Sequence, residues 1–407
     1  MIGEQEKHSG ARHVVMRELN RSLVLDLIKK RSPISRAALA EAASLAKPTV
    51  SVIVEELIAQ GTVHEVGVGQ TTKEGGRPPV LLEYDALSQC VVGVHVGVST
   101  TTVVLADALG REFHRVQLPT RRGKAERMLD RIAAAISEAV VTAGVTGRDL
   151  AVGVCIPGMT DVATGVCRLA PALGWVDVPV RDLLSEALDA PVYVHNTAQA
   201  SAVAETLEGA AQGAEDVVLL YLGSGIGSGL LSGGRLFSGS TGQAGEVGHC
   251  PVDGGVEKCP CGRLGCLETV ASGIALVRDA TRAVQSGRRT SLTLPTTVVD
   301  ITAAAGAGDE LARELLEAAG RRLGLAAAWL LNLTNPQVLV LSGGLVEVGD
   351  PLLGPLREAL SLHVLPQVAE GLVVEHSELG PDAAVRGAVL LALQYSETYY
   401  RVVFQGA

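Results

Sequence analysis

The chain has 407 residues, which is too long for one ordinary domain and predicts two or three. Its hydrophobic fraction of 47% and charged fraction of 19% exclude a disordered chain, and its 47 glycines without a Gly-X-Y period exclude collagen. A net charge of −10 would disfavour a nucleic-acid partner if it were spread evenly along the chain.

The charge is unevenly divided. Residues 1–84 hold 11 Lys or Arg against 10 Asp or Glu, which gives a net charge of +1. The remaining 323 residues hold 23 against 34, which gives −11. The acidity therefore belongs to the C-terminal part, and it does not oppose a DNA contact by the front of the chain.

No secretion signal or membrane span is visible. Met1–Asn20 is polar and lacks the apolar segment of a signal peptide. The longest apolar stretch, around Leu323–Leu333, is shorter than the about 20 residues that cross a membrane. Four of the seven cysteines fall between Cys250 and Cys266, which is typical of a metal site and not of disulfides. We expect a cytoplasmic protein without a membrane partner.

The front of the chain has helical periodicity. Apolar residues repeat every four positions between Leu19 and Ile28, and Pro33 ends this first helix. Ser35 is a suitable N-cap for a second helix over Arg36–Ala43.

A third helix is predicted after a short turn. Pro48 suits its first turn, and Gly61 takes the position after its end that favours glycine. Thr62–Val68 and Val80–Tyr84 then alternate like strands and indicate a β-hairpin wing. This order of elements predicts a winged helix-turn-helix domain over residues 1–84.

Such a domain places the N-terminal part of its third helix in the major groove of DNA. The predicted DNA contacts are Lys47, Thr49 and Ser51 on this helix, Arg36 on the second helix and Arg77 in the wing. The alternative is a helical domain for dimerisation or protein contact, and the wing favours DNA binding over it.

The rest of the chain alternates strand and helix patterns, which predicts an α/β architecture with two sheet-containing lobes. We expect a first lobe over residues 85–200, completed by about 380–397, and a second lobe over 201–379. Strands are expected at Val91–Val98, Thr101–Asp107, Ala151–Ile156, Val192–His195, Val217–Leu222, Ser228–Leu231 and Val338–Ser342. Helices are expected at Ala125–Thr142 and Glu310–Leu331.

A glycine-rich turn, Gly223–Gly229, lies between two of these strands. A strand follows it instead of a helix, which excludes a dinucleotide fingerprint, and the absence of a following Gly-Lys-Ser/Thr excludes a P-loop. Backbone N–H groups in such a turn can contact a phosphate, but a tight hairpin explains the same glycines.

The clearest chemical signal is a cluster of metal-binding residue types. Cys259, Cys261 and Cys266 lie in a short loop punctuated by glycines, and His249 is ten residues upstream of the first. Three thiolates and one imidazole predict a closed, tetrahedral structural zinc site that leaves no position for a catalytic water. Cys250 competes with its neighbour His249 as the fourth ligand, and we favour the histidine.

The run from Gly223 to Glu268, with its His-Cys-Cys-Cys motif, resembles the signature of the ROK family of repressors and sugar kinases. Four further segments carry the resemblance along the chain: Ile156-Pro157-Gly158, Leu173-Gly174-Trp175, Asn335-Pro336 and Ser342-Gly343-Gly344. It implies an actin-like, two-lobed ATPase (ROK) fold with a sugar bound between the lobes. A winged helix-turn-helix before these lobes is the arrangement of the family's repressors, such as the N-acetylglucosamine and xylose repressors.

The chain departs from the family's kinases at two places. The kinases place a general-base Asp directly after an Asn, whereas Asn196 is followed here by Thr197, whose hydroxyl has no useful basicity at neutral pH. Their phosphate turn begins with an Asp that helps to hold Mg²⁺, and here His95 stands in that position and Val98 replaces a glycine. An active sugar kinase is therefore the disfavoured alternative.

The resemblance assigns contacts with sugar hydroxyls to Asn196, Glu246, His249 and Glu268. His249 would bind zinc through one ring nitrogen and offer the other to the sugar. One asparagine of the family's pocket is Ala172 here, which leaves the identity of the sugar open. The alternative role of the two glutamates is ion pairing or loop capping.

These features together predict a repressor, homodimeric or homotetrameric, that binds a double-stranded DNA operator. A sugar or sugar phosphate would close the lobes and change the spacing of the DNA-reading helices. Control by a protein partner is the remaining alternative.

Overall fold

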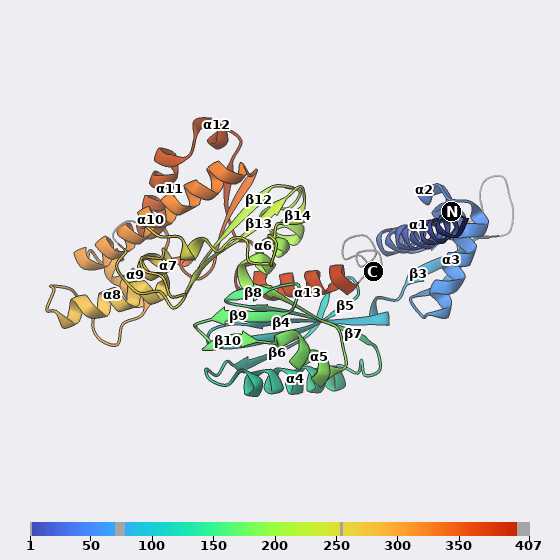
Figure 1. Ribbon diagram of the computed structural model, residues 1–407, viewed down its shortest axis with the longest axis horizontal. Helices are drawn as coiled ribbons and strands as arrows, with labels where there is room; N and C mark the ends of the chain where they lie inside the picture. The colour runs from blue at the N-terminus through green and yellow to red at the C-terminus, as the bar shows by residue number, and fades with distance from the viewer. Residues whose placement is uncertain (1, 70–77, 253–254, 397–407) are drawn as a thin grey trace.

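The computed structural model describes residues 2–69, 78–252 and 255–396. A small helical domain at the front is followed by two lobes, each built on a five-stranded sheet (Figure 1). The front domain lies at one end of the molecule, the first lobe in the middle and the second lobe at the other end.

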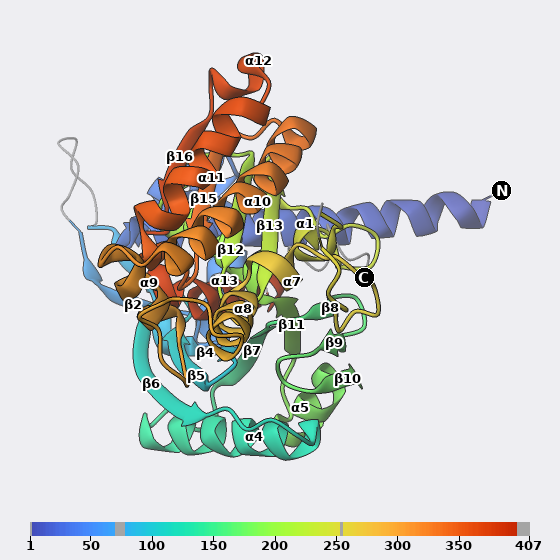
Figure 2. The same cartoon turned by 90° about the vertical axis from the view of Figure 1, so that its left-hand side faces the viewer.

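The front domain combines three helices with a small sheet. Its helices are α1 (Ile2–Arg31), α2 (Arg36–Ala43) and α3 (Lys47–Ala59). The strands β2 (Val63–Val68) and β3 (Val80–Tyr84) pair antiparallel, and β1 (Ile34–Ser35), which the sequence did not predict, pairs with β3 on its other side. Figure 2 shows the N-terminal part of α1 extending away from the rest of the molecule.

The predicted helix boundaries in this domain are confirmed. Ser35 caps α2, because its hydroxyl accepts a hydrogen bond from the Ala38 N–H at 3.2 Å. Pro48 lies in the first turn of α3, and Gly61 after its end has a φ of +71°. Within the described residues no single helix has the length and apolarity to cross a membrane, and α2 with α3 would qualify only as a pair bent by 118°.

The first lobe has a sheet with the strand order β11-β7-β4-β5-β6. These strands are β4 (Gln89–Val96), β5 (Thr100–Asp107), β6 (Glu112–Pro119), β7 (Asp149–Ile156) and β11 (Val192–Asn196). The helices α4 (Ala125–Thr142) and α5 (Val180–Leu188) cover one face of the sheet, and α13 (Ala383–Ser396) covers the other. A small sheet of β8 (Met159–Asp161), β9 (Val166–Ala170) and β10 (Trp175–Val178) extends the lobe.

The second lobe has a sheet with the strand order β14-β13-β12-β15-β16. These strands are β12 (Val217–Leu222), β13 (Ile226–Ser232), β14 (Arg235–Leu236), β15 (Val338–Ser342) and β16 (Val373–His376). Its helices are α7 (Glu268–Ala271), α8 (Gly273–Gln285), α9 (Val298–Gly306), α10 (Glu310–Thr334), α11 (Asp350–His363) and α12 (Pro366–Ala369). The long α10 and its neighbours cover one face of the sheet, and α6 (Thr197–Glu208) covers the other.

The two lobes meet through the helices α6 and α13, which pack against each other between the two sheets (Figure 1). Gly387 of α13 permits this close packing, because a Cβ atom there would lie 1.8 Å from the carbonyl oxygen of Ala200 in α6. The expected lobe boundary at residue 200 falls within α6.

Candidate functional site

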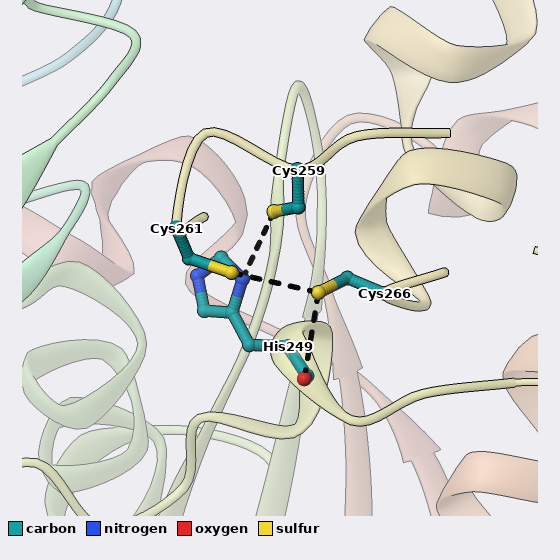
Figure 3. Close-up of side chains that lie close together, drawn as sticks. All are labelled: His249, Cys259, Cys261 and Cys266. Atoms are coloured by element: carbon teal, nitrogen blue, oxygen red, sulfur yellow. Dashed lines mark hydrogen bonds between the residues drawn. The ribbon is translucent and has the colours of Figure 1, made fainter. Parts of the chain in front are cut away.

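The four residues expected to bind a metal come together beside one loop of the second lobe (Figure 3). The ligand atoms of His249, Cys259, Cys261 and Cys266 all lie within 4.8 Å of one another. The sulfur atoms of Cys261 and Cys266 are 3.6 Å apart, and Nδ1 of His249 is 3.4 Å from Sγ of Cys259.

These distances fit a tetrahedral metal ion. With metal–sulfur bonds of about 2.3 Å, two thiolates on one tetrahedral ion lie about 3.8 Å apart, and a thiolate and an imidazole slightly less. The cluster can therefore hold a metal without a large rearrangement of its loop. The competing cysteine, Cys250, is half-buried and lies outside the cluster.

His249 joins the metal cluster to the expected sugar pocket. Its Nδ1 atom faces the cysteines, while its Nε2 atom lies 3.9 Å from Oε2 of Glu246. A metal on Nδ1 would fix the tautomer of the ring and leave the Nε2–H as a hydrogen-bond donor on the pocket side.

Two glutamates of the expected sugar site lie close enough to affect each other's charge. Burial, with a smaller effect from the charge of Glu268, raises the pKa of Glu246 to about 7. Glu268 begins α7 and accepts a hydrogen bond from the Ile226 N–H at 2.9 Å. Together with His249, these groups supply both donors and acceptors, which buried sugar hydroxyls require.

The glycine-rich turn joins β12 and β13 into a hairpin and lies next to the Glu268 carboxylate. The N–H of Gly223 donates to the carbonyl of Gly225 at 2.9 Å. A Cβ atom on Gly225 would lie 2.5 Å from a carboxylate oxygen of Glu268, so glycine makes room for that side chain. A Cβ atom on Gly223 would lie 2.8 Å from the Tyr221 ring, so close packing accounts for the glycines at 223 and 225.

Asn196 and Thr197 lie where β11 ends and α6 begins. The Oδ1 atom of Asn196 accepts from the Ala198 N–H at 2.7 Å and its Nδ2 donates to the Gly158 carbonyl at 2.9 Å, so the amide caps α6. One N–H of the amide stays available for a ligand. In the described part of the chain, no hydrogen bond or ion pair joins Asn196 to the three pocket residues of the second lobe.

Of the two positions that differ from the kinases, Thr197 is buried and His95 is half-buried. Thr197 is 4% exposed, and among the described residues its hydroxyl has no hydrogen-bond partner. Burial lowers the pKa of His95 to about 4, so this imidazole is neutral at neutral pH. A neutral imidazole lacks the negative charge with which a carboxylate holds Mg²⁺.

The expected DNA contacts differ in how accessible they are. Lys47 and Thr49 are exposed in the first turn of α3, and Ser51 is half-buried. Arg36 pairs with Glu65 on β2 at 2.9 Å, so its charge is partly neutralised by the wing. Arg77 lies outside the described residues.

Residues 91–395 match the ROK family. The chain belongs to the ROK family. This confirms the family inferred from the glycine turn and the cysteine motif.

A repressor and a kinase among the relatives of this ROK protein match different shares of its chain. The putative xylose repressor of Caldicellulosiruptor sp. (strain Rt8B.4) is 31% identical over 388 residues, which cover 94% of this chain and 97% of that protein. The glucokinase of Halalkalibacterium halodurans is 34% identical over 313 residues, which cover 74% of this chain and 94% of that protein. The difference in coverage is about the length of the front domain, which precedes the ROK region at residues 91–395.

A solved structure gives the same result. The crystal structure of a ROK family transcriptional regulator, a homologue of the E. coli MLC protein, superposes with a TM-score of 0.77 at 28% identity, covering 93% of this chain and 97% of that one. The match confirms the α/β, two-lobed ROK fold. This ROK protein therefore resembles transcriptional regulators over nearly its whole length.

Two residues that lie beside the candidate sites were not found from the sequence. Val52 of α3 is 52% exposed, three positions after Thr49 and thus on the same face of the helix. Helical spacing counted from Thr49 would have found it. Gln199 of α6 donates to the carbonyls of Gly242 and Ala244, which precede Glu246, and no sequence signal marks this contact.

Proposed function

We propose that this ROK protein is a sequence-specific DNA-binding transcriptional regulator, acting as a repressor, controlled by a sugar or sugar phosphate bound between the lobes. The main support is the whole-length similarity to ROK regulators. Kinase relatives match only about three quarters of the chain, and the ROK family region itself begins at residue 91, after the front domain.

Sugar phosphorylation is the disfavoured alternative, because two chemical requirements are unmet. A base must accept the proton of the attacking hydroxyl, and Thr197 offers only a buried hydroxyl. A carboxylate must help to hold Mg²⁺, and His95 offers a neutral imidazole. The protein is therefore proposed to bind its sugar without converting it.

The DNA-binding surface in this proposal is the exposed side of α3. Lys47, Thr49 and Ser51 would enter the major groove, and Arg36 and Arg77 would contact phosphates or the minor groove. Two copies of the front domain, in a homodimer or homotetramer, would bind an operator with two-fold symmetry.

The metal is proposed to be zinc with a structural role. Three thiolates and one imidazole suit zinc in both softness and geometry, and His249, Cys259, Cys261 and Cys266 fill all four positions. The sugar would be bound by Asn196 from the first lobe and by Glu246, His249 and Glu268 from the second. A ligand bound from both sides stabilises the closed lobes, which shifts the population away from the DNA-binding state.

Electrophoretic mobility shifts test this function. The full-length protein is mixed with DNA from upstream of its own gene, alone and with D-xylose, D-glucose, N-acetylglucosamine or N-acetylglucosamine 6-phosphate. We expect a specific complex that at least one of these ligands dissociates. Absence of any specific complex with DNA would contradict the proposal.

A further inference from the structure

A turn of the first lobe forms part of the hydrophobic core of the front domain. Ala108, between β5 and β6, is 3% exposed and belongs to the same apolar cluster as Ile28 and Leu82. Its N–H donates to the carbonyl of Ala86 at 2.8 Å, in the short segment that leaves the wing. The position of this turn therefore sets where the front domain sits on the first lobe.

The turn is held together by its own hydrogen bonds. A single carboxylate oxygen of Asp107 accepts hydrogen bonds from the N–H groups of Leu109 and Arg111, both at 2.9 Å. Gly110 completes the turn with a φ of +78°, and its N–H donates to the Asp107 carbonyl at 2.8 Å. These bonds link Gly110 to Ala108 within one turn, so a displacement of Gly110 would also displace Ala108.

Arg386 of α13 binds this turn and the end of α6 at once. Its Nη1 donates to the carbonyl of Gly110 at 2.6 Å. Its Nε and Nη2 bind the carboxylate of Glu208, the last residue of α6, at 2.9 and 2.6 Å. The Arg386 side chain is only 16% exposed, which favours a well-defined bidentate pair.

The same helix α6 is attached to the second lobe and to the pocket. Asn196 and Thr197 stand at its start, and Gln199 donates to the Gly242 and Ala244 carbonyls at 2.9 and 3.2 Å. Glu205 is fully buried and accepts from two backbone N–H groups of the segment before α13, those of Glu378 and Leu379. Twelve residues of helix, about 18 Å, thus join the pocket to Glu208.

We propose that Arg386 is the positioning residue through which the pocket controls the DNA-binding domain, because it joins Glu208 of α6 to the Gly110 turn. This inference rests on the proposed function. In this proposal, closure of the lobes shifts α6 along α13 and moves Glu208 away from the Gly110 turn. The Arg386 guanidinium then stays with Glu208 and loses its hydrogen bond to the Gly110 carbonyl. Without this hydrogen bond the 107–111 turn can shift. Because Ala108 packs in the core of the front domain, the front domain shifts with it.

Arg386→Met removes both bonds, and Arg115→Met is the matched control. Arg115 also forms Arg–carboxylate pairs, with Asp382 and with Glu112 at 2.7 Å each, but among the described residues it has no hydrogen bond or ion pair with the 107–111 turn. For the full-length protein, operator affinity is measured with and without each of the four sugars above, and sugar binding is measured by calorimetry. We expect the wild type and Arg115→Met to lose operator affinity about ten-fold or more with the active sugar, and Arg386→Met less than about two-fold, with sugar binding retained. An unchanged response in Arg386→Met would overturn the proposal.

A swapped pair separates the two bonds of Arg386. Glu208→Arg combined with Arg386→Glu restores the ion pair between α6 and α13. It cannot restore the bond to Gly110, because a carboxylate has no hydrogen to donate to the Gly110 carbonyl. We expect this double variant to remain unresponsive, and recovery of the wild-type response would show that only the link between helices matters and would overturn the proposal. Arg386→Gln, which keeps a polar side chain but has no cation to pair with Glu208, replaces Arg386→Met if the latter does not fold.

Hydrogen–deuterium exchange of the full chain tests the turn without DNA or sugar. We expect the N–H groups of Ala108 and Leu109 to exchange faster in Arg386→Met than in the wild type, and at the wild-type rate in Arg115→Met. Equal rates in Arg386→Met and the wild type would overturn the proposal. A wild type that binds neither DNA nor sugar contradicts the proposed function, and the exchange result then tests separately whether Arg386 holds the turn.

Discussion

The Nδ1 atom of His249 lies 3.4 Å from the Sγ atom of Cys259. The same imidazole turns its other nitrogen toward Glu246, so one side chain would belong to both the metal cluster and the proposed sugar site. Disturbing the metal should therefore disturb the pocket as well, because the ring loses the ligand that fixes its orientation.

Replacing one cysteine of the cluster should remove the metal. In Cys261→Ser we expect most of the zinc to be lost on metal analysis and the free energy of unfolding to fall by about 3 kcal/mol or more, because loss of a metal is one of the large-effect changes. Cys250→Ser, outside the cluster, should keep both the zinc and the melting temperature. Full zinc occupancy in Cys261→Ser would refute this set of ligands.

Lys47→Ala should weaken operator binding through the loss of one phosphate contact. We expect the slope of log affinity against log salt to become shallower by about 0.9, because one fewer counterion is released. Fluorescence anisotropy over a salt series measures this slope. Lys124→Ala, exposed on the first lobe, is the control and should leave the slope unchanged. Equal slopes for Lys47→Ala and the wild type would place α3 away from the DNA.

His195 predicts how stability depends on pH. Burial, with a smaller effect from the charge of Arg181, lowers the pKa of this histidine from 6.5 to about 3. The unfolded chain takes up a proton as the pH falls below 6.5 while the folded chain does not, so stability is lost toward acid. The loss is about 1.4 kcal/mol per pH unit for one such histidine.

His195→Leu should remove part of this pH dependence. Neither ring nitrogen of His195 has a hydrogen-bond partner among the described residues, so an apolar side chain of similar size should cost little at neutral pH. Between pH 6 and pH 4, we expect its unfolding free energy in denaturant titrations to fall by about 1.4 kcal/mol less per pH unit than that of the wild type. Parallel curves would show that His195 does not stay neutral in the fold.

The wild-type protein should not phosphorylate sugars. Thr197→Asp restores the general base, a contribution of about 10²–10⁴-fold in kinases, but His95 still lacks the charge that holds Mg²⁺. We therefore expect no ADP release with glucose, N-acetylglucosamine or mannose from either protein in a coupled assay, with a ROK glucokinase as positive control. Turnover by the wild type would refute the role given to Thr197.

The features that could be predicted from the sequence depend on short-range signals. Ser35, Pro48 and Gly61 mark helix ends because capping acts over a few residues. The cysteines of the metal cluster were found because their three thiols lie within eight residues, so that one short loop brings them together. The central strands were found because both of their faces are buried.

The features that could not be predicted depend on packing between distant segments. All four residues of the edge strand β16 are exposed, so its sequence does not show the alternation of apolar and polar residues that marks a half-buried strand. Arg386 and Glu208 are 178 residues apart, and nothing in either helix indicates the other as its partner. Arg36 was expected to contact DNA because of its charge and position. Its ion pair with Glu65 could not be predicted, because it depends on how β2 packs against α2 in the folded domain.

In the proposed mode of regulation, a sugar bound between the lobes controls operator binding. The most direct measurement is the affinity of the full-length protein for its operator, by fluorescence anisotropy, with and without the sugar that calorimetry shows to bind. We predict an affinity lower by about ten-fold or more with the sugar, and no such change in Glu268→Ala. An operator affinity that is the same with and without a bound sugar would contradict the account.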